Sequence, residues 1–131
     1  MNTKTIPGAA AFLGVAAATV GTAADVLPVG DLIAKIKSPE DAVRGPAWQA
    51  SGPVGAPAVG PLAEVMSDAH CEIARSAKRA IEKIVRYAGR PGADAERKAV
   101  EAELIKLLAH AQVNVRRHAV WMLSEIGDDA A

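Results

Sequence analysis

The sequence of 131 residues predicts an all-α domain built from helical hairpins. Apolar residues recur at helical spacing in three separate segments, and another amphipathic stretch precedes each of them. No segment alternates between apolar and polar residues as a half-buried strand would. We therefore expect a unit of helix, short turn and helix to occur three times along the chain.

The first 24 residues differ in kind from the rest. After Lys4 no charged side chain occurs until Asp25, and the run between them is apolar and rich in Ala. One positive charge, an apolar run and small residues near Ala23 are typical of a secretory signal peptide. We expect residues 1–24 to be cleaved on export to the periplasm or the extracellular space, leaving no membrane span. The alternatives are an Ala-rich first helix of a cytoplasmic protein, or a membrane anchor.

Three long helices share one pattern of apolar residues. Counted from Val43, Ile73 and Val115, offsets 4, 7, 8 and 11 fall on one face of a helix. Fourteen of the fifteen positions are apolar, and the fifteenth is a small serine. The positions are Val43, Ala47, Ala50, Ser51, Val54, Ile73, Ala77, Ala80, Ile81, Ile84, Val115, Ala119, Met122, Leu123 and Ile126. We expect these residues to form one continuous core.

Another amphipathic helix is expected before each long one, over residues 31–37, 58–66 and 95–109. The predicted repeat domain spans residues 25–131. Its three units cover about residues 31–55, 57–88 and 94–127.

Local residues predict where the helices begin and end. Ser38 provides a capping hydroxyl with Pro39 in the first helical turn, and Asp94 is placed to cap a later helix in the same way. Pro46 removes a backbone donor inside the first long helix. We expect that helix to be short or bent and to end near residues 51–52, and the next to begin around Pro57.

The last long helix, residues 115–127, begins with an aliphatic–Arg pair, has Ala at mid-face and closes with Ile-Gly. Residues 43–55 repeat the pattern, whereas the middle unit has Ala74 in place of Arg and Val85 in place of Gly. This layout resembles HEAT repeats of the short type first noted in phycobilisome lyases. The resemblance implies a short right-handed α–α superhelix that binds proteins along a concave face lined by the second helix of each pair.

Composition excludes several classes of function. Fifteen basic and fifteen acidic residues cancel, which makes a strongly basic nucleic-acid binder unlikely. The single cysteine, Cys71, excludes an internal disulfide framework and a multi-Cys zinc site. His70 and Glu72 flank it, but His110 and His118 lie in another unit, so we predict no metal or cofactor. No catalytic motif is present, and we expect a protein that is not an enzyme.

Candidate binding residues lie away from the apolar stripes. Arg75, Arg79 and Arg86 fall opposite the stripe of the middle long helix, and Arg117 and Trp121 lie off the stripe of the last. Arginine donates to carboxylates in planar pairs, so these residues suggest a partner with an acidic surface. The sequence favours the simpler alternatives: a solvated helix face with ordinary ion pairs, and a Trp121 that packs against a neighbouring unit.

The leading expectation is thus a scaffold that binds proteins. The resemblance alone suggests a second possibility, a bilin lyase-like or enzyme-accessory protein. A third is a fragment of a longer repeat protein, since the sequence stops where another first helix would be expected. The open C-terminal edge would then be covered by a partner, by a second copy or by further repeats.

Overall fold

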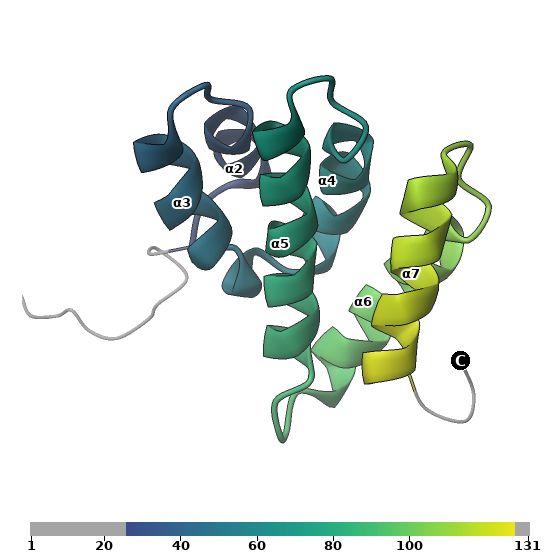
Figure 1. Cartoon of the computed structure of the whole chain (residues 1–131). Coiled ribbons are helices and arrows are strands. Elements are labelled where there is room, and N and C mark those ends of the chain that lie inside the picture. Colours follow the sequence, from purple (N-terminus) through teal and green to yellow (C-terminus); the bar gives the residue numbers. More distant parts are fainter. Residues whose placement is uncertain (1–25, 128–131) are drawn as a thin grey trace, which may run out of the picture.

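The computed structural model describes residues 26–127, and within them every regular element is helical, which confirms the predicted all-α class (Figure 1). The predicted signal segment, residues 1–24, lies outside the described residues. The elements are α2 (Val29–Ile36), α3 (Asp41–Gln49), η4 (Gly52–Val54), η5 (Ala56–Ala58), α4 (Val59–Val65), α5 (Cys71–Ala88), α6 (Asp94–Leu107) and α7 (Val113–Ile126).

The helices pair as three hairpins, α2 with α3, α4 with α5, and α6 with α7. The second helices form a row in which α3 packs against α5 and α5 against α7, while α4 packs against α6 behind them (Figure 1). This order is compatible with a solenoid. The right-handed superhelical sense stays a prediction.

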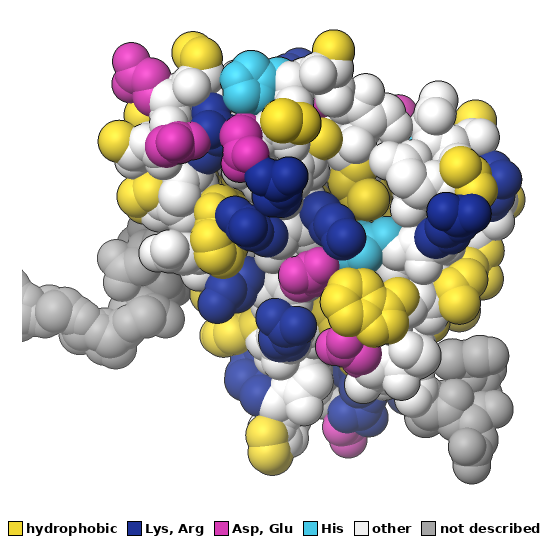
Figure 2. Space-filling model, viewed as in Figure 1, with side chains coloured by type: hydrophobic (Ala, Val, Ile, Leu, Met, Phe, Trp, Pro, Cys, Tyr) yellow, Lys and Arg dark blue, Asp and Glu magenta, His cyan; other side chains and the backbone are white. Residues whose placement is uncertain are grey.

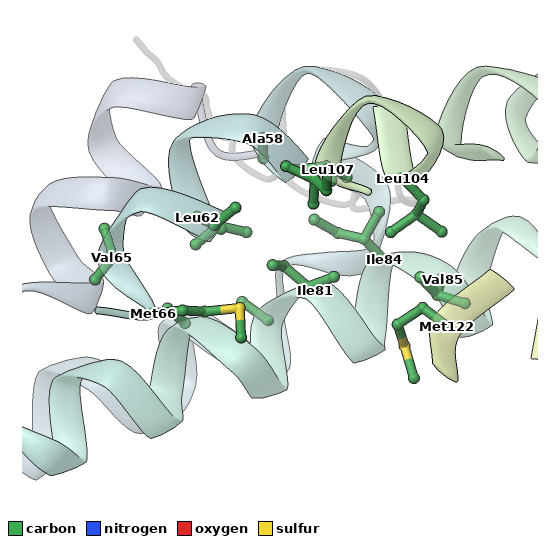
Figure 3. Packing of buried hydrophobic residues seen from close by; sticks show 14 of the residues in the cluster. Ala58, Leu62, Val65, Met66, Ile81, Ile84, Val85, Leu104, Leu107 and Met122 are labelled. Carbon is green, nitrogen blue, oxygen red and sulfur yellow. The ribbon is translucent and has the colours of Figure 1, made fainter. Parts of the chain in front are cut away.

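One core runs through all three hairpins. Side chains of α4, α5, α6 and α7 meet in it, among them Leu62, Ile81, Leu104 and Met122 (Figure 3). The five predicted face positions of α5 are all buried, and so are four of the five in α7, with Leu123 packed at the margin. Burial of this apolar surface is the main favourable contribution to folding.

The prediction for Ala50 is wrong, because this residue is exposed. α3 ends at Gln49, and the N–H of Ala50 donates to the carbonyl oxygens of Pro46 and Ala47 at the helix end. The chain then tightens into η4, so the helical period that would have buried Ala50 no longer applies.

The second helices begin at the same position in every unit. Each N-cap residue has extended backbone and lies three positions before the predicted starts Val43, Ile73 and Val115. These N-cap residues are Glu40, His70 and Gln112. The three helices therefore enter the fold in the same register.

A side chain two positions earlier accepts the N–H of each N-cap residue. The acceptors are Ser38 Oγ at 3.2 Å, Asp68 Oδ1 at 2.8 Å and His110 Nδ1 at 3.1 Å. Three residue types thus fix the turn between the helices in the same way. Because serine, aspartate and histidine differ chemically, the sequence alone does not show that they share this role in the three turns.

Two predicted caps are wrong, by two residues and by one residue. Ser38 precedes the true N-cap, and α3 begins at Asp41, so Pro39 lies outside the helix. Asp94 is the first residue of α6 and makes no capping bond. Its carboxylate instead lies 3.0 Å from Arg97 in the first turn, where the helix dipole favours a negative charge.

Between the first two hairpins the proline-rich segment forms η4 and η5 before α4 begins at Val59, two residues after Pro57. Gly55 joins the two turns with a φ of 79°, in the left-handed region that favours glycine. Among the helices of residues 26–127, none combines the length and the apolar character needed to cross a bilayer.

Candidate functional site

The exposed side chains of α3, α5 and α7 form one surface, which we call the second-helix face. Lys and Arg side chains gather over α5 at the middle of this face (Figure 2). They lie there because α5 buries its apolar stripe against the other helices and leaves the opposite, basic side in solvent.

The five predicted site residues all lie on this face, but not at one point. Arg75, Arg117 and Trp121 line a groove between α5 and α7. Arg79 lies on the other side of α5, against Trp48 of α3. Arg86 lies further along α5 and lines a separate depression beside η4.

The groove between α5 and α7, called here the α5–α7 groove, is open and has a volume of about 450 Å³. It combines three cationic side chains with an indole, an amide, an imidazole and two apolar residues. Its lining consists of Met66, Ala74, Arg75, Lys78, Asn114, Arg117, His118 and Trp121.

Trp121 forms one wall of the groove and is 47% exposed. Its ring is tilted 57° to that of His118, with 6.0 Å between the ring centroids, and Lys78 Nζ lies 6.0 Å from the indole. The indole therefore packs against its neighbours and still offers nearly half of its surface to a ligand.

The floor of the groove is formed by His118, which is 6% exposed. Its Nε2 lies 3.3 Å from Glu82 Oε2. Burial lowers the pKa of His118, and the hydrogen bond to Glu82 opposes this shift. Glu82 interrupts the basic run of α5 in the sequence, and this contact across to α7 explains its presence.

A second tryptophan lies on the opposite flank of α5. Trp48 is partly buried against the core, as expected for packing between repeats. Arg79 Cζ lies 5.4 Å from its ring centroid and Lys83 Nζ 5.8 Å from it. A cation over an exposed indole is worth about 0.5–1 kcal/mol, which is enough to orient these side chains.

Most cations of this face have no carboxylate partner among the described residues. On α5, Arg75 pairs with Glu72, in the intrahelical manner that the sequence favours. The others have no acidic side chain within ion-pairing distance in residues 26–127. These unpaired cations are Lys78, Arg79, Lys83, Arg86 and, on α7, Arg117.

Five lining residues were not among the predicted site residues: Met66, Ala74, Lys78, Asn114 and His118. Lys78 lies beside Arg75 and Arg79 in the sequence and could have been included from the helical period. His118 and Asn114 could not, because their role depends on how closely α7 approaches α4 and α5.

The arrangement is suited to binding carboxylates and apolar groups. Across residues 26–127, no three side chains of the metal-ligating types lie close enough to hold an ion together. No family model matches the sequence, and no curated protein or solved structure matches it either.

Proposed function

We propose that this chain is a HEAT-like repeat scaffold, without enzymatic activity of its own, that binds a protein partner with the second-helix face. One observation carries the proposal. A row of cations lacking carboxylate partners in residues 26–127 lies between two tryptophans on the exposed side of α3, α5 and α7.

Charge supports this proposal. The protein has a formal net charge of zero, so enough acidic residues exist to neutralise every cation. On α5, Glu82 lies three or four residues from Lys78, Arg79 and Arg86, at the spacing of intrahelical ion pairs. Its carboxylate instead lies 3.3 Å from His118, and it forms no ion pair with these cations. A surface kept basic on a neutral protein favours an acidic partner.

The exposed indole supports it as well. Tryptophan and arginine are enriched among the residues that dominate the energy of protein interfaces. Trp121 and Arg117 provide one such pair, and Trp48 with Arg79 provides a second on the other side of α5.

The proposal is tested by affinity capture from the source cells with the full chain and with a Trp121→Ala/Arg79→Glu double variant. The captured proteins are identified by mass spectrometry. We expect the variant to lose partners that the native chain retains. Its far-UV circular dichroism should be unchanged, because both side chains lie outside the core.

A matched control is Lys35→Ala/Lys37→Glu, which also truncates one exposed side chain and reverses one exposed charge, but at the C-terminal end of α2, away from the second-helix face. This control should capture the same partners as the native chain. Identical recoveries from the native chain and the Trp121→Ala/Arg79→Glu variant would contradict the proposal.

A further inference from the structure

We infer that the α5–α7 groove is the anchor point for the partner and that it takes an acidic segment of that protein, with an apolar side chain next to a pair of carboxylates. This inference rests on the proposed function and names the part of the partner that is recognised.

The three cations of the groove differ in whether they already pair with a carboxylate of this chain. Arg75 holds the carboxylate of Glu72, whereas Lys78 and Arg117 have no acidic partner within residues 26–127. They extend from α5 and α7 on opposite sides of the same groove. Two separate positive charges facing one space are complementary to two carboxylates of one peptide.

Apolar surface also lines the groove. Trp121 presents its exposed ring, and Met66 and Ala74 add apolar surface at the end of α4 and the start of α5. An aliphatic or aromatic side chain of the partner would be largely desolvated there. Such burial contributes about 25 cal/mol for each Å² of apolar surface removed from water.

The floor is fixed before the partner arrives. His118 is held by Glu82, and the Asn114 side-chain amide donates to the carbonyl oxygen of Met66 at 3.3 Å. Both contacts link α7 to the middle hairpin. A groove whose lining is already ordered loses less conformational entropy on binding.

A polyanion is less complementary to the groove than an acidic peptide. Glu82 lies against the floor, and Glu125 of α7 is close enough to influence the titration of His118. These carboxylates would repel a continuous phosphate backbone, whereas a peptide with two acids and an apolar residue can keep its charges over Lys78 and Arg117. Binding of an oligonucleotide is therefore an outcome of the test rather than the proposal.

The test uses the full chain in a Trp48→Phe background, so that Trp121 is the only tryptophan and its emission reports on the groove. The probes are short fluorescein-labelled peptides in which Leu or Phe is flanked by Asp and Glu. Control peptides carry Asn and Gln at the acidic positions. Fluorescence anisotropy measures binding, and unlabelled peptides are used for the Trp121 emission.

We expect the acidic peptides to bind saturably and to change Trp121 emission. The amide peptides should bind at least about tenfold more weakly. The Lys78→Glu/Arg117→Glu variant should lose at least about tenfold in affinity, whereas Lys35→Glu/Lys37→Glu, which reverses the same number of charges at the C-terminal end of α2, should bind like the parent.

Three results would overturn the inference: acidic peptides that do not bind, acidic peptides that bind equally well to the Lys78→Glu/Arg117→Glu variant, or a single-stranded oligonucleotide that binds more tightly than the peptides. The same variant in the affinity capture separates this inference from the proposed function. If it keeps the partners while Trp121→Ala/Arg79→Glu loses them, the second-helix face stands and the carboxylate anchor does not.

Discussion

Arg44 and Arg116 occupy the same position in the first and last second helices and make the same contact. In each, Nη1 donates at 2.7 Å to the carbonyl oxygen six residues earlier, Ser38 in one unit and His110 in the other. The Arg of the aliphatic–Arg pair thus fastens the turn between the two helices. The middle unit has Ala74 at this position and lacks the contact.

Replacing this arginine should destabilise the fold. Arg44 is almost fully buried, so Arg44→Ala leaves a carbonyl group without its charged donor and should cost about 1.5–3 kcal/mol. Urea denaturation measures the change. Arg117→Ala, an exposed neighbour of Arg116, is the control and should stay within about 0.5 kcal/mol of the parent. Equal stabilities for both variants would show that the turn contact contributes nothing.

His118 makes stability depend on pH. Because burial lowers its pKa from the usual 6.5, the unfolded chain binds more protons than the folded chain as pH falls through that value. Stability is therefore lost progressively from about pH 6.5 downward, until the pKa of the folded state is passed. His118→Gln should flatten this part of the profile, measured by urea denaturation between neutral and mildly acidic pH. An unchanged slope would contradict this assignment.

At the level of the helices, apolar spacing predicted the buried faces better than the capping residues predicted the helix ends. The starts at Val43, Ile73 and Val115 all lie three residues after an N-cap, as the apolar spacing predicts. Val43 is only partly buried, however, and lies outside the core cluster that contains Ile73 and Val115. The end of α3 was missed because Pro46 and the following η4 turn replace the helical period with a tighter one. Helix propensity alone does not predict at which residue the α-helix gives way to the tighter turn.

The contact between η4 and α5 depends on a glycine. A Cβ atom added at Gly52 would lie 2.9 Å from the Cβ of Tyr87, so the turn or the helix would have to move. Gly52→Ala should cost about 1–3 kcal/mol, as overpacking does. Thermal denaturation followed by circular dichroism measures it.

Gly30→Ala provides the matched comparison for Gly52. Gly30 lies in α2 with open space around its Cα and no proline after it, so alanine should stabilise that helix by about 0.5–1 kcal/mol. Opposite signs for the two substitutions are the expected result. A neutral Gly52→Ala would mean that η4 does not pack closely on α5.

The candidate site was predictable only in part, because it depends on the placement of separate helices. Arg75, Arg117 and Trp121 could be placed on exposed helix sides from their spacing alone. That these three share a groove, and that Arg79 and Arg86 lie outside it, depends on how α3 and α7 are placed on either side of α5. Sequence spacing within one helix carries no information on that placement.

At the scale of the whole molecule, the last hairpin is less well covered than the others. Of the six large hydrophobic side chains that are exposed in residues 26–127, five belong to it. Helical spacing puts Val113 and Val120 on one stripe of α7 and Ile105 and Leu108 on one stripe of α6. A repeat stack exposes such surface where no further unit covers it.

We expect the isolated chain to self-associate weakly through this edge. Sedimentation velocity over a range of concentrations should show a rising mean sedimentation coefficient. Val120→Asp/Ile105→Lys should suppress the rise, because both side chains are exposed and their loss leaves the core intact. A variant that associates as strongly as the parent would locate the contact elsewhere.

The order of the hairpins determines whether the second-helix face exists, and methyl-labelled NMR of the full chain measures that order directly. We predict nuclear Overhauser contacts between methyl groups of α5 and α7 and between those of α4 and α6, with α3 connected to α5. Met122 of α7 and Ile81 of α5 belong to the buried cluster that would supply such signals (Figure 3). Contacts that join the first hairpin mainly to the third, bypassing the second, would contradict the arrangement and with it the second-helix face.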